Sequence, residues 1–205
     1  MKSGRWRMLR HGWFAAALTF AAPQAHAANE LAFMMTGDQA RSPIGWVQFC
    51  ADQPQECDVA PTTPRDVVLS TKAWKDLVRI NNRVNETIKP MTDLDHYGVV
   101  EKWAYPEDGY GDCEDYVLLK RRILMDAGWP REALLITVVR DQKGDGHAVL
   151  TVKTDRGELI LDNQNHAIVP WYESGYVFVK RQSQSNPNVW ISLGDTRAAT
   201  ATASH

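Results

Sequence analysis

The chain has few cysteines and little that would hold it in a membrane. Cys50, Cys57 and Cys113 are the only cysteines among 205 residues. Cys113 has no Cys or His nearby at zinc-ligand spacing, and its sequence neighbours offer oxygen donors, which argues against zinc. The longest apolar run, residues 13–22, has 10 residues, whereas a membrane span takes about 20. No internal repeat is visible.

The N-terminus has the three parts of an export signal. A positive head precedes the apolar run, and Ala25-His26-Ala27 fits the small-x-small cleavage rule. The basic residues of the head are Lys2, Arg5, Arg7 and Arg10. We therefore predict a signal peptide over residues 1–27, cleaved after Ala27, and a periplasmic location. The alternative is an uncleaved anchor.

The mature chain, residues 28–205, has no excess of positive charge. Loss of the signal leaves 19 basic against 25 acidic residues, a net charge of about −6. Nucleic acid and anionic membrane surfaces both require a basic patch, so neither is an expected partner. The length predicts one domain with a hydrophobic core, over residues 28–194. Residues 195–205 are small and polar and are predicted to be a disordered tail.

Export bears on the cysteines, because the periplasm is oxidising. Cys50 and Cys57 lie seven residues apart around a proline-containing segment, which predicts a disulfide between them. The alternative is two buried free thiols. Cys113 then has no partner, and an unpaired cysteine in an exported protein is either reactive or shielded.

The pattern of apolar residues predicts helices first and strands afterwards. Residues 28–69, rich in proline, and residues 89–111 are expected to be irregular. Helices are predicted over 71–88, with Ser70 or Thr71 as N-cap, and over 113–126. Strands are predicted over 134–140, 147–153, 158–163, 176–181 and 189–192. The order indicates an α+β fold with an antiparallel sheet.

Three asparagines lower the helix propensity of residues 71–88. Asn81, Asn82 and Asn85 are expected to face solvent. Asn81 nevertheless falls near the apolar stripe of this helix, where its side chain would instead bond a neighbouring loop. Both environments stay open for Asn81.

One short motif carries the chemistry. Cys113 lies in Gly111-Asp112-Cys113-Glu114-Asp115-Tyr116 at the start of the second predicted helix. His147 follows a glycine-rich turn, and Asp162 ends a strand-like run. A thiol, an imidazole and a carboxylate supply the nucleophile, the base and the orienting group that acyl transfer through a thiol requires.

Strand register indicates that His147 and Asp162 meet. If Lys153 pairs with Glu158 across the turn, opposite charges face each other, which favours this register. Asp162 is then a diagonal neighbour of His147 on the same face of the sheet, within reach of a hydrogen bond. A slip of one residue would move Asp162 to the other face. Asn163 and Asn165 are the alternative orienting residues.

The carboxylates beside Cys113 conflict with its ionisation. A helix N-terminus and an imidazolium lower a thiol pKa, whereas Asp112, Glu114 and Asp115 raise it. The carboxylates could cap the helix, with Asp112 as N-cap and Asp115 three residues on. They could pair with basic residues, or hold a cation such as Ca²⁺, which takes several oxygen ligands. All three arrangements stay open.

The Gly111–Tyr116 motif, with His147 before a strand and Leu161-Asp162-Asn163 after one, resembles the bacterial transglutaminase-like cysteine proteinases. Trp46-x-x-Phe49-Cys50 and Trp103 are similar to that family too, so the resemblance covers most of 40–182. It implies a papain-like/transglutaminase-like core, with the nucleophile helix packed on an antiparallel sheet. It further implies Cys113 as nucleophile, His147 as base and Asp162 as orienter.

The resemblance also implies ligands and partners. Members of the periplasmic adhesin-releasing type bind calcium through carboxylates flanking the cysteine, here Asp112, Glu114 and Asp115; no organic cofactor is implied. Their protein substrate is a large surface adhesin, cut near its N-terminal region. They are regulated by an inner-membrane cyclic-di-GMP receptor, which connects them to biofilm formation.

The expected function is therefore an exported cysteine endopeptidase that works through a thioester acyl-enzyme. The backbone N–H of Cys113 is the expected first oxyanion donor. Trp103, Tyr105 and Tyr110 are candidates for the cleft walls. One alternative is a transglutaminase or other amide-transfer enzyme with the same triad, and another is a non-catalytic periplasmic binding module.

Overall fold

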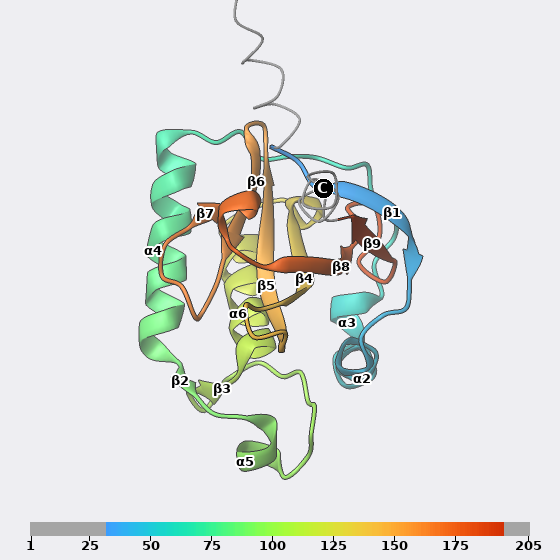
Figure 1. Ribbon diagram of the computed structural model, residues 1–205, viewed down its shortest axis with the longest axis vertical. Helices are drawn as coiled ribbons and strands as arrows, with labels where there is room; N and C mark the ends of the chain where they lie inside the picture. Colours follow the sequence, from blue (N-terminus) through green and yellow to red (C-terminus); the bar gives the residue numbers. More distant parts are fainter. Residues whose placement is uncertain (1–31, 195–205) are drawn as a thin grey trace, which may run out of the picture.

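The computed structural model describes residues 32–194, which form a seven-stranded antiparallel sheet with helices on one face (Figure 1). The strand order is β1-β9-β8-β4-β5-β6-β7. The strands are β1 Met35–Ala40, β4 Leu134–Arg140, β5 Gly146–Thr154, β6 Gly157–Leu161, β7 Val169–Pro170, β8 Val177–Gln182 and β9 Trp190–Gly194. The predicted signal peptide, residues 1–27, and the predicted tail, 195–205, lie outside the described residues.

The helices come mostly before the central strands in the sequence, as predicted. They are α2 Ile44–Asp52, α3 Pro54–Cys57, α4 Thr71–Thr87, α5 Asp93–Tyr97 and α6 Cys113–Asp126. Two short strands, β2 Lys89–Pro90 and β3 Tyr110–Gly111, pair in parallel near α5. Single 3₁₀ turns lie at η1 Arg131–Ala133 and η2 Trp171–Glu173. Among the described residues no helix is both long and apolar enough to span a membrane.

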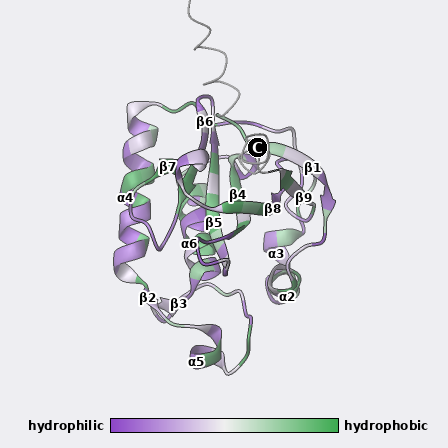
Figure 2. Cartoon of the chain, viewed as in Figure 1, coloured by the Kyte–Doolittle hydropathy of each residue, from purple (hydrophilic) through white to green (hydrophobic). Residues whose placement is uncertain are grey.

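Helix α6 packs against β5, and α4 packs against α6, so that both helices cover the same face of the sheet (Figure 1). Leu77 and Ile80 of α4 join Leu118 of α6 in the main hydrophobic core. The predicted N-cap Ser70 is confirmed, because its side chain accepts a hydrogen bond from the N–H of Ala73. Figure 2 shows hydrophilic residues along much of α4 and hydrophobic ones on the central strands.

The other face of the sheet is covered as well. Val149 of β5 and Ile160 of β6 pack there with Trp171 and Phe178. Because β5 is buried on both faces, eight of its nine residues are buried. The short helical and irregular segment after β6 therefore covers the strands that carry the candidate site.

Most predicted elements are confirmed, but two regions predicted to be irregular contain regular structure. Residues 89–111 hold β2, α5 and β3. Helix α6 has the predicted bounds, and the five predicted strands are present with small shifts at their ends. The described part of 28–69 is not irregular throughout, because β1, α2 and α3 lie there. The prolines open these helices: Pro43 is the N-cap of α2, and Pro54 is the first residue of α3. A proline at a helix start loses no hydrogen bond.

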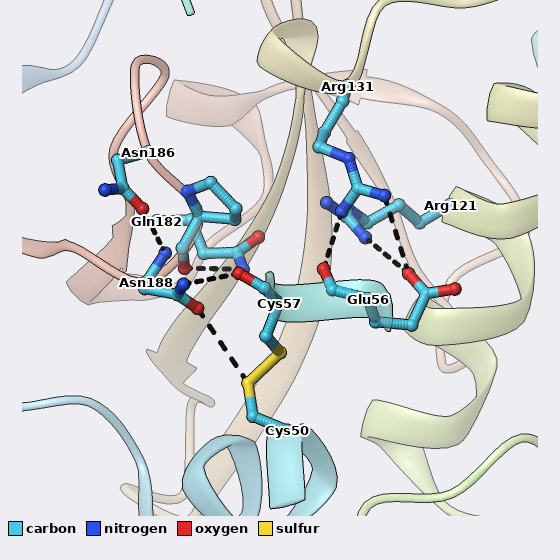
Figure 3. Close-up of a disulfide and its surroundings, with 9 residues drawn as sticks. Cys50, Glu56, Cys57, Arg121, Arg131, Gln182, Asn186 and Asn188 are labelled. Atoms are coloured by element: carbon cyan, nitrogen blue, oxygen red, sulfur yellow. Dashed lines mark hydrogen bonds and ion pairs between the residues drawn. A yellow bond between two sulfur atoms is a disulfide. The ribbon is translucent and has the colours of Figure 1, made fainter. Parts of the chain in front are cut away.

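The Cys50–Cys57 disulfide is present and joins α2 to α3 (Figure 3). The two Cα atoms are 5.5 Å apart. Asn188 donates to the carbonyl of Cys57 at 2.6 Å, and its Oδ1 lies 3.8 Å from Cys50 Sγ. The second distance is a contact only, since a disulfide sulfur carries no hydrogen. The disulfide thus joins α2 to α3, and the hydrogen bond from Asn188 ties α3 to the segment that precedes β9.

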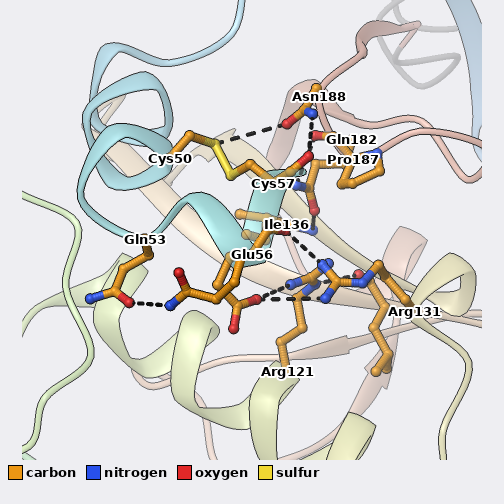
Figure 4. A network of polar contacts seen from close by, with 12 residues as sticks. Cys50, Gln53, Glu56, Cys57, Arg121, Arg131, Ile136, Gln182, Pro187 and Asn188 are labelled. Atoms are coloured by element: carbon orange, nitrogen blue, oxygen red, sulfur yellow. Dashed lines mark hydrogen bonds and ion pairs between the residues drawn. A yellow bond between two sulfur atoms is a disulfide. The ribbon is translucent and has the colours of Figure 1, made fainter. Parts of the chain in front are cut away.

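Glu56, next to the disulfide, connects α3 to α6 and to η1 (Figure 4). Its Oε2 lies 3.8 Å from Arg121 Nη1 and 3.7 Å from Arg131 Nη2. Arg131 also donates to the carbonyl of Glu56 at 3.0 Å. Arg121 is 1% exposed, and burial, with Arg131 nearby, lowers its pKa to about 10. These contacts fix α3 against the body of the domain.

Candidate active site

Cys113 is the first residue of α6 and the one free cysteine in the described part of the chain. It is half-buried and lines a cavity of about 230 Å³. His147 and Ala148 of β5 line the same cavity, together with Trp103 and Glu114. The packing of α6 on β5 therefore brings the thiol and the imidazole to one hollow.

His147 lies at the start of β5 and is 4% exposed. Its Nε2 is 2.8 Å from Oδ1 of Asp162, the residue that directly follows β6. The predicted register is confirmed, because Lys153 pairs with Glu158, and their charged groups are 2.9 Å apart. The diagonal arrangement of His147 and Asp162 follows from this register.

The alternative orienting residues are not bonded to the imidazole. Asn163 Oδ1 is buried without a hydrogen-bond partner among the described residues, and Asn165 Oδ1 accepts from the N–H of Ala167. Among these three candidates the carboxylate of Asp162 is the group at His147.

Both oxygens of the Asp162 carboxylate are held. Oδ1 also accepts from the N–H of Gln164 at 3.1 Å, and Oδ2 accepts a short hydrogen bond from the hydroxyl of Tyr176. Burial alone would raise the pKa of Asp162, but the hydrogen bonds from His147 and Tyr176 and the charge of His147 outweigh it and lower the pKa. Asp162 is thus kept ionised and oriented.

An ionised Asp162 determines the tautomer of His147. Since the carboxylate can only accept, Nε2 carries the hydrogen and Nδ1 has the free electron pair. The amide nitrogen of Gln164 lies 3.4 Å from Nδ1. Nδ1 is therefore the ring nitrogen that can accept a proton.

The backbone carbonyl of Asp162 is held from two helices. Asn85 Nδ2 of α4 donates to it at 2.8 Å, and Lys120 Nζ of α6 donates at 2.9 Å. Asn81 donates to the carbonyl of His166 in the same loop at 3.1 Å. The prediction that Asn85 faces solvent is wrong, and the loop contact left open for Asn81 is present.

Sequence reasoning missed Asn85, Lys120 and Tyr176. Lys120 is fully buried. The one sign of its role in the sequence is that a lysine stands among the apolar residues of its helix. Asn85 and Tyr176 had none, because their partners lie 77 and 14 residues away along the chain.

An acidic cluster lies beside the thiol, with a different membership from the predicted one. One oxygen each of Asp93, Asp112 and Glu114 lies within 4.8 Å of the other two. Asp93 comes from α5 and also accepts a short hydrogen bond from the N–H of Lys102. Burial raises the pKa of Asp93 and of Asp112, and burial with the Asp112 charge raises the pKa of Glu114 to about 9.

The third predicted ligand, Asp115, lies outside this set of three oxygens. Its Oδ1 accepts from the N–H of Ala104 at 2.8 Å, and its Oδ2 is buried without a hydrogen-bond partner among the described residues. Burial raises the pKa of Asp115 to about 8. It packs against Gly111, where an added Cβ would lie 2.6 Å from Oδ2.

The helix-capping alternative for these carboxylates holds for position but not for hydrogen bonding: Asp115 lies in the first turn of α6 as predicted. Asp112 occupies the N-cap position of α6, yet its side chain makes no capping hydrogen bond. Its Oδ1 is buried without a partner in the described part of the chain. A buried carboxylate oxygen with no donor is costly, and a cation would compensate it. The donor set, oxygen only and crowded, fits Ca²⁺.

The thiol of Cys113 faces one of these carboxylates. Sγ donates to Glu114 Oε2 at 3.1 Å. Burial and then the charge of Glu114 raise the pKa of Cys113 well above its ordinary value, while the backbone of Ala148 lowers it. Positive charge at the acidic cluster would favour the thiolate.

Of the three predicted cleft walls only Trp103 lines the cavity. Its indole N–H donates to Glu101, another lining residue, at 2.8 Å. Tyr105 instead packs against Phe49 and lies under Arg122. Tyr110 belongs to β3.

Comparisons with known proteins agree with this fold. The model of a family described as bacterial transglutaminase-like cysteine proteinase matches residues 36–198. Calcium-bound Legionella pneumophila LapG is 24% identical over 60% of this chain and 71% of its own, with a TM-score of 0.51. An EGTA-treated structure of the same protein is 25% identical over 61% and 73%, with a TM-score of 0.49. No curated protein matches the chain. The predicted α+β, transglutaminase-like fold is confirmed.

Proposed function

The chain belongs to the bacterial transglutaminase-like cysteine proteinases, and on that premise we propose that Cys113, His147 and Asp162 are the triad of a cysteine endopeptidase. The observation that carries the proposal is the Nε2–Oδ1 contact of 2.8 Å between His147 and Asp162, together with the cavity that both His147 and Cys113 line.

The proposed reaction begins with proton transfer from Cys113 Sγ to His147 Nδ1. The thiolate attacks a peptide carbonyl carbon, and the carbonyl oxygen becomes an oxyanion. The N–H of Cys113 is free to bind it, because the first residues of a helix have no acceptor within the helix. The imidazolium then protonates the leaving amine as the C–N bond breaks and a thioester forms. Water, deprotonated by His147, attacks the thioester and releases the second product.

We propose that calcium is held by Asp93, Asp112 and Glu114. Support comes from the crowding of their oxygens, from the unpartnered Oδ1 of Asp112, and from the calcium-bound state of the similar LapG structure. A bound divalent ion would supply positive charge that offsets the carboxylates around the thiol. Asp115 is assigned instead to positioning the segment at Ala104.

We also propose an exported enzyme with a protein substrate, following the signal-like N-terminus and the family. A surface adhesin cut in its N-terminal region, and an inner-membrane cyclic-di-GMP receptor as regulator, are the partners that the resemblance implies. The single-domain size and the negative charge are compatible with a periplasmic enzyme.

The test is cleavage of surface proteins by the mature chain, residues 28–205, with and without a chelator. We expect new fragments with wild type and none with Cys113→Ala at an unchanged melting temperature. Cleavage that survives Cys113→Ala would overturn the triad. A labelled amine incorporated in preference to hydrolysis would assign amide transfer instead. A Cys113 thiol no more reactive than free cysteine would assign a binding module.

A further inference from the structure

We propose that Lys120 and Asn85 are positioning residues of this site: together they hold the backbone of Asp162, and so the carboxylate that orients His147. The inference rests on the proposed triad. Neither residue touches the cavity, so neither is a catalytic residue.

The geometry is a clamp on one carbonyl oxygen. Lys120 and Asn85 donate to it at 2.9 and 2.8 Å from two helices that pack against each other. Asp162 stands at the end of β6, where the sheet no longer fixes the backbone. Its next strand, β7, begins at Val169. The clamp therefore replaces ladder hydrogen bonds at the point where the chain leaves the sheet.

Packing does not account for a lysine at this place. Lys120 is 0% exposed, and burial of an ammonium is expensive unless it is compensated. Its polar contact is the Asp162 carbonyl, with the ring of Tyr116 5.9 Å away. Methionine has a similar length and would fill the space without that cost. The buried amine is consistent with a role in positioning the backbone of Asp162.

The two donors differ in charge, and this separates their effects. Asn85 fixes the carbonyl by a neutral hydrogen bond. Lys120 adds positive charge at the backbone of Asp162, which favours the ionised carboxylate. Burial, opposed by Asp162, lowers the pKa of Lys120 to about 7, so the amine is charged in acidic solution and loses its proton as the pH rises through 7.

The experiment compares Lys120→Met and Asn85→Ala with two matched controls. Asn82→Ala removes another half-buried asparagine of α4, and Lys72→Met removes an exposed lysine of the same helix. Three quantities are measured: kcat and KM for peptide cleavage, the melting temperature, and the downfield proton resonance of the His147–Asp162 hydrogen bond. Lys120→Gln, which keeps a donor without charge, replaces Lys120→Met if that variant fails to fold.

We expect each clamp variant to lower kcat about tenfold with KM within about twofold, since misplacing a catalytic group acts on the chemical step. The downfield resonance should broaden or move upfield in both, and the controls should match wild type. Unchanged kcat in both clamp variants would overturn the inference. The inference would also be overturned if activity falls in proportion to a lowered melting temperature while the His147–Asp162 resonance is unchanged. If wild type cleaves nothing, the triad proposal fails, and the resonance alone still decides whether the clamp positions His147.

Discussion

Trp103 occupies the space that a side chain on Gly45 would need. A Cβ built on Gly45 would lie 2.3 Å from Cδ1 of the indole, so the two cannot coexist without movement. Trp103 lines the candidate active site and meets Trp46 of α2 edge to face, with ring centroids 6.2 Å apart. Gly45 thereby allows α2 to pack against the wall of the cavity.

Gly45→Ala is therefore expected to displace Trp103. We expect a loss of about 1–3 kcal/mol in the free energy of unfolding, typical of overpacking, and a lower rate of peptide cleavage. Urea denaturation measures the loss in the free energy of unfolding, and Trp fluorescence reports the displacement of Trp103. Gly98→Ala is the control for any glycine substitution, because a Cβ added to Gly98 would have no atom within 4 Å, while its φ of +71° adds backbone strain alone. Unperturbed fluorescence in Gly45→Ala would contradict this account.

The disulfide predicts a second stability effect. The Cys50–Cys57 loop is short, and closing a loop of about eight residues stabilises the folded state by roughly 2–3 kcal/mol through the unfolded chain. We expect Cys50→Ala/Cys57→Ala to lose that amount in urea denaturation at pH 7. Reductant should destabilise wild type to a similar degree and leave the double variant unchanged. A further loss in the double variant on reduction would mean that the effect does not come from this bridge.

The metal proposal distinguishes Asp93 from Asp115. We expect calcium to raise the melting temperature of wild type, and Asp93→Asn or Asp112→Asn to abolish that increase, because each supplies an oxygen of the cluster. Asp115→Asn should keep the calcium response. Isothermal titration with calcium alone checks the same ranking without activity. Retained binding in Asp93→Asn together with loss in Asp115→Asn would return the site to the ligand set predicted from sequence.

Local rules predicted the His147–Asp162 contact because few strand registers are compatible with the turn between β5 and β6. A tight turn and the opposite charges of Lys153 and Glu158 fix the register, and register fixes which face each side chain occupies. The bounds of α6 followed from the local pattern of apolar residues over 113–126. Both arguments use residues that are close in sequence.

The rest depends on contacts that sequence does not display. Asp93 lies 19 residues before Asp112 in a stretch without periodicity, so nothing connected it to the cluster. Asn85 and Lys120 bind a backbone carbonyl, and a carbonyl has no residue type to recognise. The sequence does not predict α2 and α3, because a proline that begins a helix looks the same in the sequence as a proline in irregular chain.

Lys120 also gives the stability of the protein a specific pH dependence. An unfolded lysine titrates near pKa 10.4, whereas burial lowers the pKa of Lys120 to about 7. Below pH 7 the amine is charged in both states, and the folded state bears the whole cost of burying it. Between pH 7 and about 10.4 the unfolded state binds more protons, so this contribution to stability rises with pH.

Lys120→Met removes that contribution and leaves the Asp162 carbonyl bonded to Asn85. We expect the variant to be more stable than wild type by about 2–4 kcal/mol at pH 6, with the difference shrinking as pH rises to 10. Urea denaturation across this pH range measures it, and Lys72→Met, whose side chain is 88% exposed, should show no such trend. A variant that is less stable than wild type at pH 6 would show that the amine stabilises the fold. Greater stability combined with slower cleavage would instead mean that the buried charge costs stability and serves the site.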